Sequence, residues 1–433
     1  MRSQRQNIYG WGRFPVVSSS VYRPESLAQL RSVVLSSPRI LATGSRLSYG
    51  DACLGDVTID MRRLDKILDF DSSTGMITVE AGITLDDLLR VIVPRGWFVP
   101  VTPGTKFVTV GGCVGSNVHG KNHHTAGCFG RHVRSMHIVL ADGSLVESSS
   151  KKNKDLFVAT LGGQGLVGVV YAIQLQLHRT PSSFVDVTYT KCSSLRSLMR
   201  SLEVADHTHE YTVAWIDTFS AGRGIVIAGN HRQRGKLLVH KEPRVTVPPF
   251  FPSFFMRSVF LRVFNAIYYH VHPSGDRVVH YDSFFYPLDA LRHWNRLYGR
   301  RGFVQYQLVV PLEHAHGSVS DILRVVGKSR IGSFLTVLKR FGKGDGGLSF
   351  PFEGYTLTLD FPVCQETRHL VARLDSIVRR YGGRLYLAKD ALMRKEFFVE
   401  AYPSLSAWLA VKKKYDPTNK FVSRQSTRLG LAV

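Results

Sequence analysis

Cysteine is scarce in this chain, and its spacing excludes two classes of protein. The five cysteines among 433 residues are Cys53, Cys113, Cys128, Cys192 and Cys364, and no two of them form a CxxC pair. Zinc ribbons and fingers need such pairs, and small disulfide scaffolds need a much higher cysteine density. We therefore expect no metal site and no disulfide framework, as in a protein of a reducing compartment.

Long apolar runs are also missing. The sequence contains no uncharged apolar stretch of the roughly 20 residues that a bilayer-spanning helix needs. Its first residues, 1–17, are basic but lack a continuous apolar core, so we read no secretory signal. These absences predict a cytoplasmic protein without a transmembrane helix. A location at the periplasmic face of the membrane stays open as the alternative.

Acidic residues are few relative to basic ones. The 56 Lys and Arg against 33 Asp and Glu give a formal net charge of +23. Such a surplus favours an anionic partner: nucleic acid, anionic lipid or a phosphorylated substrate. The alternative is a diffusely basic surface of no specific use. No basic block dominates, since the densest are 232–236 and 412–414, so a nucleic-acid-binding tail is not expected.

One stretch, from Pro103 to Gly130, is unusually rich in glycine and histidine: PGTKFVTVGGCVGSNVHGKNHHTAGCFG. The residues 108–110 predict a short buried strand, which would place the glycines at a strand end. Backbone N–H groups at such a place can approach a ligand closely. The alternative is a tight turn with incidental histidines.

Two further glycine-rich segments flank this stretch. Residues 44–51 (GSRLSYGD) follow an expected strand, 39–43, and suit pyrophosphate binding, although a simple loop is the alternative. Residues 161–168 precede an apolar strand, 169–177. Neither segment is a GxGxxG motif opening a long helix, so a Rossmann nucleotide site is disfavoured.

Periodicity predicts an α+β chain. In the first part, a helix follows Ser26, Thr84 starts a short helix, and Asp142-Gly143 turns a hairpin. Strands 57–61 and 76–82 are expected to be joined by the turn 71–75. From Thr180 onward, strands alternate with helices in the manner of an antiparallel sheet covered on one face. The expected strands there are 211–217, 225–228, 304–310 and 355–361, and the expected helices are 193–204, 318–327 and 366–381.

The segment 247–272 predicts an aromatic-rich amphipathic helix that begins at Pro252-Ser253. Its polar face gathers Arg257, Ser258, Arg262 and Asn265. Such a helix fits the membrane interface or packs on its own domain, and the basic character of the chain favours the membrane.

The three glycine loops, followed by a mixed second part and a returning tail, resemble the FAD-binding fold of the vanillyl-alcohol-oxidase (PCMH) type. Within it, HGKNHHTAGCFGRHVRSM (119–136), FVQYQLVVP (303–311), GRLYLAKD (383–390) and YDPTNKF (415–421) resemble the decaprenylphosphoryl-β-D-ribose 2′-oxidase family over nearly the whole chain. The resemblance implies a two-domain FAD-linked oxidase with an antiparallel-sheet substrate domain. Its parts are an FAD-binding domain 1–180, a substrate domain 181–385 with the insertion 247–272, and a C-terminal segment 386–433 returning to the first domain.

The resemblance also implies which residues hold the cofactor. The segment Ala42–Ala52 would bind the FAD pyrophosphate. His119, which some relatives join covalently to the flavin, would line an FAD held non-covalently. The other cofactor positions are Thr43, Gly44, Ser45, Arg46, Leu47, Ser48, Tyr49, Gly104, Thr105, Thr109, Val110, Gly111, Gly112, Ser116, Asn117, Val118, Val170 and Tyr386.

For the substrate, the resemblance implies a set of lysines and polar side chains. Lys389 is the candidate base, Tyr49 an assisting hydroxyl and Lys121 the partner of the substrate phosphate. Read from the residues alone, Lys389 is better explained as a surface cap. For each lysine, the alternative to a role in proton transfer or substrate binding is a cation near the flavin. The substrate positions are Lys121, Trp215, Gln307, Lys339, Thr358 and Lys389, of which Thr358 stands where the family often has a cysteine.

The implied activity is oxidation of the 2′-hydroxyl of a polyprenylphosphoryl-β-D-ribose to the 2′-keto sugar, the first half of epimerisation to an arabinose donor for cell-wall arabinan. A short-chain NAD(P)H-dependent reductase is the implied partner, with peripheral membrane contact and no nucleic acid. Two alternatives stay open: a soluble sugar, alditol or lactone oxidase that uses FAD and oxygen, and a basic, non-catalytic binding protein on the same scaffold.

Overall fold

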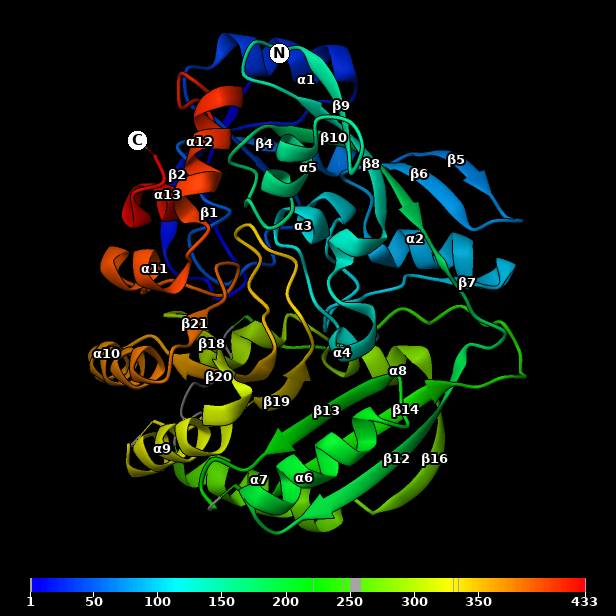
Figure 1. The fold of residues 1–433 in the computed structure, drawn as a ribbon, viewed down its shortest axis with the longest axis vertical. Helices are drawn as coiled ribbons and strands as arrows, with labels where there is room; N and C mark the ends of the chain where they lie inside the picture. The colour runs from blue at the N-terminus through cyan, green and yellow to red at the C-terminus, as the bar shows by residue number, and fades with distance from the viewer. Residues whose placement is uncertain are drawn as a thin grey trace.

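The computed structural model describes residues 2–432 except 221, 244, 250–257, 330 and 334. Figure 1 shows two regions, one above the other. The upper one, the N-terminal region, contains both chain ends and the elements from β1 to β11. The lower one, the large-sheet region, is built on a single wide sheet.

Two sheets form the N-terminal region. In the first, β2 and β3 both run parallel to β4, and β1 pairs antiparallel with β2. The second is antiparallel throughout. In spatial order the first sheet is β1 (Gln4–Tyr9), β2 (Val16–Tyr22), β4 (Val57–Asp60) and β3 (Leu41–Thr43). The second is β5 (Ile67–Asp71), β6 (Met76–Glu80), β10 (Val169–Gln176), β8 (Val133–Val139) and β9 (Leu145–Ser149).

One connection predicted from the sequence is wrong. The turn 71–75 joins β5 to β6 rather than the strand 57–61 to 76–82. Strand β4 instead lies in the other sheet, between β2 and β3. Alternation marks each strand correctly, but it does not say which sheet a strand joins.

The helices of this region begin at the expected capping residues. Ser26 caps α1 (Leu27–Ser36) and Thr84 caps α2 (Leu85–Ile92), each accepting from a backbone N–H in the first turn. The strand expected at 108–110 does not form. Thr109 instead caps α3 (Val110–Gly115), its hydroxyl accepting from Gly112 N at 3.1 Å, so this cap overrides the β-propensity of the flanking valines.

The large sheet is antiparallel throughout and confirms the strands and helices expected beyond residue 180. Its spatial order is β16 (Gly275–His280), β12 (Phe184–Cys192), β14 (Gly224–His231), β13 (Tyr211–Ile216), β19 (Thr336–Phe341), β20 (Gly354–Pro362), β18 (Phe303–Pro311) and β21 (Arg384–Leu385). The helices α6 (Leu195–Asp206), α9 (Ala315–Lys328) and α10 (Gln365–Arg380) pack on it as a layer, in which α9 contacts both α6 and α10.

Shorter elements complete the chain. The two-stranded pairs are β7 (Trp97–Phe98) with β11 (His178–Arg179), and β15 (Val245–Thr246) with β17 (Leu291–Arg292). The other helices are α4 (His123–Ala126), α5 (Lys154–Thr160), α7 (Ser258–Val271), α8 (Tyr281–Phe285), α11 (Lys395–Ala401), α12 (Leu405–Tyr415) and α13 (Arg424–Leu429).

The loop 342–353, between β19 and β20, links the two regions. In Figure 1 it rises, in gold, from the large sheet into the N-terminal region. Its Ser349 Oγ accepts from Asn117 Nδ2 at 2.8 Å, and its Gly347 carbonyl accepts from Ser404 Oγ at 2.7 Å. The chain end also returns upward, since Phe421 pairs with Ile40 and α12 packs on α5.

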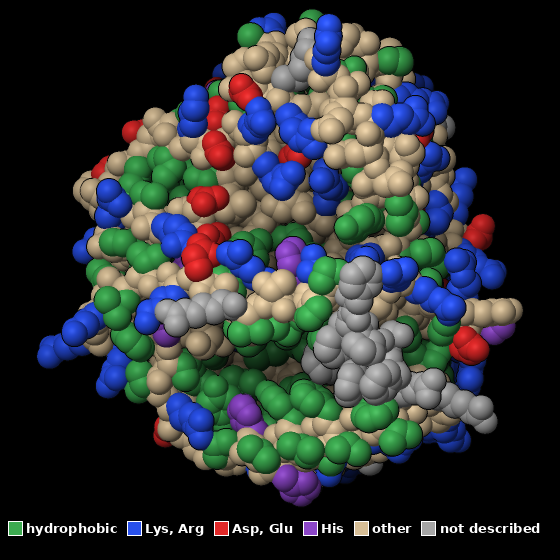
Figure 2. All heavy atoms as spheres, turned by 180° about the vertical axis from the view of Figure 1, so that it is seen from behind, with side chains coloured by type: hydrophobic (Ala, Val, Ile, Leu, Met, Phe, Trp, Pro, Cys, Tyr) green, Lys and Arg blue, Asp and Glu red, His purple; other side chains and the backbone are tan. Residues whose placement is uncertain are grey.

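Helix α7 turns an apolar face outward. Val259, Val263 and Ile267 are 67%, 55% and 57% exposed, whereas Asn265 is buried and donates to Asp217 Oδ1 at 2.9 Å. The expected start at Pro252-Ser253 and the expected polar Arg257 lie outside the described residues. Across the part of the chain that the structure describes, we find no helix with the length and apolarity to cross a bilayer. Figure 2 shows apolar side chains around a hollow in the lower half of the opposite face.

Candidate functional site

The loop after β3 presents unpaired polar atoms. Arg46 Nη1 and Ser48 Oγ are buried and form no hydrogen bond with any described residue. Gly44 packs against Thr109 so closely that an added Cβ would lie 2.0 Å from Thr109 Oγ1. Buried donors left without partners on a tight glycine loop fit an anionic group such as a pyrophosphate, which would supply the missing acceptors.

The backbone near this loop leaves space that a dinucleotide would fit. A Cβ added at Gly104 would meet no atom within 4 Å, and one at Gly165 would meet only the Ala42 carbonyl, at 3.9 Å. Gly165 has φ +73°, which side-chain-bearing residues rarely adopt. The three glycine segments contact one another, since Gly44 packs against Thr109 and Gln164 N donates to the Gly115 carbonyl at 2.8 Å.

The side-chain amide of Asn117 connects two other segments of the chain. Its backbone has φ +38°, its Oδ1 accepts from Gly130 N at 2.9 Å, and its Nδ2 donates to Ser349. The neighbouring Ser116 carbonyl accepts from the Tyr386 hydroxyl at 2.9 Å. The large-sheet region and the C-terminal segment thus both brace the turn between α3 and His119.

His119 lies at the centre of the predicted site. Gln307 Nε2 lies 3.0 Å from His119 Nε2, and Lys339 Nζ lies 3.2 Å from His119 Nδ1, so each ring nitrogen has a polar partner. Its ring packs against Phe341 and Tyr386, with centroids 4.7 and 5.5 Å away. Burial, reinforced by the charge of Lys339, holds the pKa of His119 well below its usual range, so the ring stays neutral.

The sheet register places the predicted substrate residues on one face. Trp215 lies opposite Val337, which lies opposite Thr358, which in turn lies opposite Gln307. Directly opposed residues of antiparallel strands share a face, so these four form a row across β13, β19, β20 and β18. Lys339 is two residues beyond Val337 and therefore points to the same side.

Three lysines at the site have lowered pKa values. Desolvation lowers the pKa of Lys389 to about 7, that of Lys121 to about 7 and that of Lys339 to about 8. The charge of Lys339 contributes to the shift of the other two, which shows that the three amines share one electrostatic environment. Among the described residues, none of the three forms an ion pair with a carboxylate.

Lys389 and Tyr49 form a close pair. Lys389 Nζ lies 3.9 Å from the centroid of the Tyr49 ring, and Tyr49 N donates to the Ala388 carbonyl at 3.0 Å. Burial raises the pKa of Tyr49 well above its usual range, so its hydroxyl stays protonated and can donate a hydrogen bond but not remove a proton.

Asp360 is a further residue of this site, which no motif of the sequence indicates. Its carboxylate is fully buried, accepts from Gln305 Nε2 at 2.7 Å, and has a second oxygen, Oδ2, without a hydrogen-bond partner among the described residues. Burial raises the pKa of Asp360 to about 7, and the opposite charge of Lys389 opposes that rise. The alternation Thr356, Thr358, Asp360 on β20 places all three on one sheet face, which is the signal that could have revealed it.

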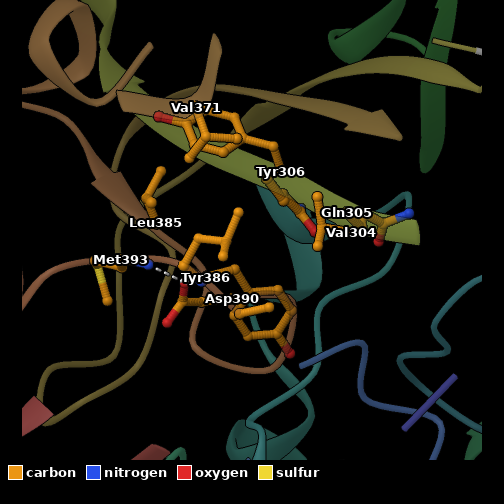
Figure 3. Close-up of a pocket in the computed structure, with 11 residues that line it drawn as sticks. Val304, Gln305, Tyr306, Val371, Leu385, Tyr386, Asp390 and Met393 are labelled. Carbon is orange, nitrogen blue, oxygen red and sulfur yellow. Dashed lines mark hydrogen bonds between the residues drawn. The ribbon is translucent and has the colours of Figure 1, made fainter. Parts of the chain in front are cut away.

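A small pocket lies behind the Lys389 turn (Figure 3). Its volume between the side chains of β18, α10 and the turn is about 10 Å³, room for roughly one water molecule. In Figure 3 Asp390 accepts a hydrogen bond from Met393 N, at 2.7 Å, across this turn. The lining residues are Val304, Gln305, Tyr306, Gln307, Val371, Leu385, Tyr386, Asp390, Ala391, Leu392 and Met393.

Several other predicted residues contact neighbouring parts of the protein. The Thr43 hydroxyl donates to the Ile59 carbonyl, Val170 is half-buried on β10, and Trp215 packs on Tyr268 of α7 with centroids 4.8 Å apart. Lys121 Nζ donates to the Phe284 carbonyl and lies 4.1 Å from the centroid of that ring. Cofactor or substrate contact by these residues stays a prediction.

Comparisons with known proteins agree with this geometry. A family described as "FAD binding domain" matches residues 19–149, and one described as "D-arabinono-1,4-lactone oxidase" matches residues 358–429. A decaprenylphosphoryl-beta-D-ribose oxidase of Mycolicibacterium smegmatis is 34% identical over 98% of each chain. An L-gulonolactone oxidase of Mus musculus is 24% identical over 93% of each chain.

Proposed function

The chain belongs to the FAD-linked oxidases of the vanillyl-alcohol-oxidase (PCMH) type, which act on CH–OH groups, and from this premise we propose that it oxidises the 2′-hydroxyl of a polyprenylphosphoryl-β-D-ribose. The observation that carries the proposal is the cluster of Lys121, Lys339 and Lys389, which form no ion pair among the described residues. Amines without carboxylate partners favour an anionic substrate, and the phosphate of such a lipid supplies one.

The cradle around the three glycine segments would hold the cofactor, with Arg46 and Ser48 at the pyrophosphate. The chemistry that bound FAD supplies is acceptance of the hydride that leaves the sugar carbon. We propose non-covalent binding, because both ring nitrogens of His119 already have polar partners, Gln307 and Lys339.

The protein's part in the oxidation is to take the hydroxyl proton and to orient the sugar. Lys389, with its pKa near 7, is the base in this proposal, because an amine poised near the working pH is neutral often enough to accept a proton. Tyr49 donates a hydrogen bond to the substrate. Lys121 pairs with the phosphate as a point charge, and neutral His119 with Gln307 fixes the sugar.

The test is anaerobic mixing of the FAD-loaded protein with a prenylphosphoryl-β-D-ribose while flavin absorbance is followed. We expect the yellow colour to bleach, and we expect the 2′-deoxyribose analogue, which lacks the reacting hydroxyl, to leave it unchanged. Bleaching by both compounds, or by neither, contradicts the proposal. A separate NAD(P)H-dependent short-chain reductase would then return the keto sugar to the hydroxyl level.

The lipid tail suggests peripheral membrane contact through α7. Its outward residues Val259, Val263 and Ile267 form an apolar strip on a strongly basic chain, which suits an anionic bilayer surface. We expect aspartate at all three positions to reduce co-sedimentation with anionic vesicles and to slow turnover of a long-chain substrate. Turnover of a short-chain analogue should stay within about twofold of the parent rate, because these side chains lie outside the catalytic face.

A second candidate function is oxidation of a sugar lactone with oxygen as acceptor. The match of residues 358–429 to the D-arabinono-1,4-lactone oxidase family favours it. Peroxide formation from D-arabinono-1,4-lactone or L-gulonolactone, without bleaching by the prenylphosphoryl ribose, would establish this second function and exclude the first.

A further inference from the structure

The C-terminal helix α13 reaches the two loops that carry Tyr49 and Lys389. Arg428 donates from Nε and Nη2 to the two carboxylate oxygens of Asp51, at 3.0 and 2.7 Å, and from Nη2 also to Asp390 Oδ2 at 2.8 Å. A third nitrogen, Nη1, donates to the Met393 carbonyl. One guanidinium therefore joins two carboxylates that come from distant parts of the sequence.

Both carboxylates are buried, which makes this bridge strong. Asp51 is 5% exposed and Asp390 is 6% exposed. Charge-assisted hydrogen bonds in a site shielded from water are worth more than surface ion pairs, and the planar guanidinium is suited to hold two carboxylates at once. Without Arg428, the two buried negative charges would repel each other.

Each bridged carboxylate follows a residue of the proposed catalytic pair. Asp390 is next to Lys389 and fixes the turn after it, accepting from Leu392 N and Met393 N at 2.9 and 2.7 Å. Asp51 closes the loop that contains Tyr49. The loops touch directly, because an added Cβ at Gly50 would lie 1.8 Å from the Asp390 carbonyl oxygen.

We propose that Arg428 is a positioning residue that clamps the loop 48–51 against the loop 386–393 and so holds Lys389 Nζ over the Tyr49 ring. Arg428 does not touch the reacting atoms and acts only through Asp51 and Asp390. Its assignment as a catalytic aid rests on the proposed function, whereas the clamp itself does not.

The experiment compares the parent holoenzyme with Arg428→Ala and with the matched control Arg424→Ala. Arg424 lies on the same helix, is half exposed, and pairs with Asp56 at the surface. Hydrogen exchange followed by mass spectrometry reports the backbone amides of both loops. We expect faster exchange in 47–54 and 386–393 for Arg428→Ala only, and about 20 mM guanidinium chloride, far below unfolding concentrations, to restore protection where equal sodium chloride does not.

Turnover provides the second measurement. We expect kcat to fall about 10- to 100-fold in Arg428→Ala with KM nearly unchanged, because the reacting groups are misplaced while the substrate-binding face is intact. Guanidinium should recover part of kcat. Parent-like exchange at both loops, or a parent-like kcat, overturns the proposal.

Two further outcomes are distinguishable. If Arg428→Ala does not fold, Arg428→Lys carries the test, since one ammonium cannot reproduce the bidentate bridge: slower kcat with faster loop exchange supports the clamp, and parent values overturn it. If the parent protein fails to oxidise the prenylphosphoryl ribose, the proposed function fails while the exchange measurement still decides the clamp.

Discussion

Two lysines of the C-terminal segment, Lys412 on α12 and Lys389 at the candidate site, have opposite surroundings. Lys412 of α12 is buried and donates to Asp416 Oδ2 at 2.8 Å and to the carbonyls of Leu166 and Phe421 at 2.8 and 3.1 Å. Lys389, in contrast, faces the Tyr49 ring and forms no hydrogen bond through Nζ with any residue that the structure describes.

This difference distinguishes a lysine that is buried to stabilise the fold from one that is desolvated at a reactive site. Every hydrogen of the Lys412 ammonium has an acceptor, so the charge fastens α12 to the glycine segment 161–168 and to the chain end. Lys389 loses its water without gaining a hydrogen bond or an ion pair through Nζ. The charge of Asp360 offsets only part of this desolvation, so the pKa of Lys389 falls to about 7 and its charge costs stability. A desolvated amine without a hydrogen-bond or ion-pair partner is typical of a site where chemistry needs one.

Lys389→Met should produce the largest change. We expect flavin reduction by the prenylphosphoryl ribose to slow by about 10²- to 10⁴-fold, the range for loss of a general base. A variant that stays yellow and is reduced at the parent rate would refute the base assignment. Stopped-flow absorbance measures it.

The same variant should be more stable than the parent. Because the folded-state pKa of Lys389, about 7, lies below its ordinary value, Lys389 destabilises the fold when it is forced to carry its charge. The gain in stability for Lys389→Met should therefore be largest near pH 7 and below, and should fade as pH rises toward about 10.4. Denaturant midpoints at several pH values measure it, and a loss of stability at pH 7 would contradict it.

Lys412→Met should have the opposite effects: a loss of stability and little change in activity. Removal of the ammonium leaves the buried Asp416 carboxylate unpaired, so we expect the free energy of unfolding to fall by about 3–5 kcal/mol. Flavin reduction by the protein that stays folded should be close to the parent rate. Adding Asp416→Asn should recover part of the loss, and no recovery would show that the ion pair is not the cause.

Lys339→Gln should shift the pH dependence of flavin reduction. The positive charge of Lys339 lowers the pKa of Lys389, so its removal raises that pKa. The rise of the rate with pH should then move upward, by up to about one pH unit. A shift downward, or none, would separate Lys339 from the Lys389 environment.

Asp360→Asn should shift the pH dependence of flavin reduction the least, and in the direction opposite to the shift expected for Lys339→Gln. Its ionised carboxylate raises the pKa of Lys389, so the asparagine variant should reach its full rate at slightly lower pH. Stability offers an independent check. The raised folded-state pKa of Asp360, about 7, makes the parent lose stability as pH rises from about 4 to about 7, and the variant should lack that slope.

Much of the fold followed from local patterns in the sequence. The caps at Ser26 and Thr84 and the alternating strands of the large sheet need only neighbouring residues to be recognised. The strand predicted at 108–110 was wrong. Val-Thr-Val favours a strand in isolation, but the Thr109 hydroxyl caps a helix that begins at Val110 and continues through the glycines.

Sequence motifs predicted part of the candidate site. The residues whose role depends on tertiary contacts could not be predicted from the sequence. Glycine and histidine density predicts a cofactor cradle at 103–130, and the resemblance supplied Lys389 as the candidate base; both stay predictions. Asp360 and Arg428 escaped because their importance depends on partners, Gln305 in one case and Asp51 with Asp390 in the other, that only tertiary structure brings together. No single-strand or single-helix pattern encodes such a pairing.

The loop 342–353 limits how this protein can be recombined with its relatives. Ser349 and Gly347 reach out of one region to meet Asn117 and Ser404 in the other. A chimera that exchanged the large sheet as a cassette would bring a foreign loop tip against a native turn, beside the cofactor cradle. A graft that transfers substrate preference between relatives should therefore exchange this loop together with the residues that it contacts, Asn117 and Ser404.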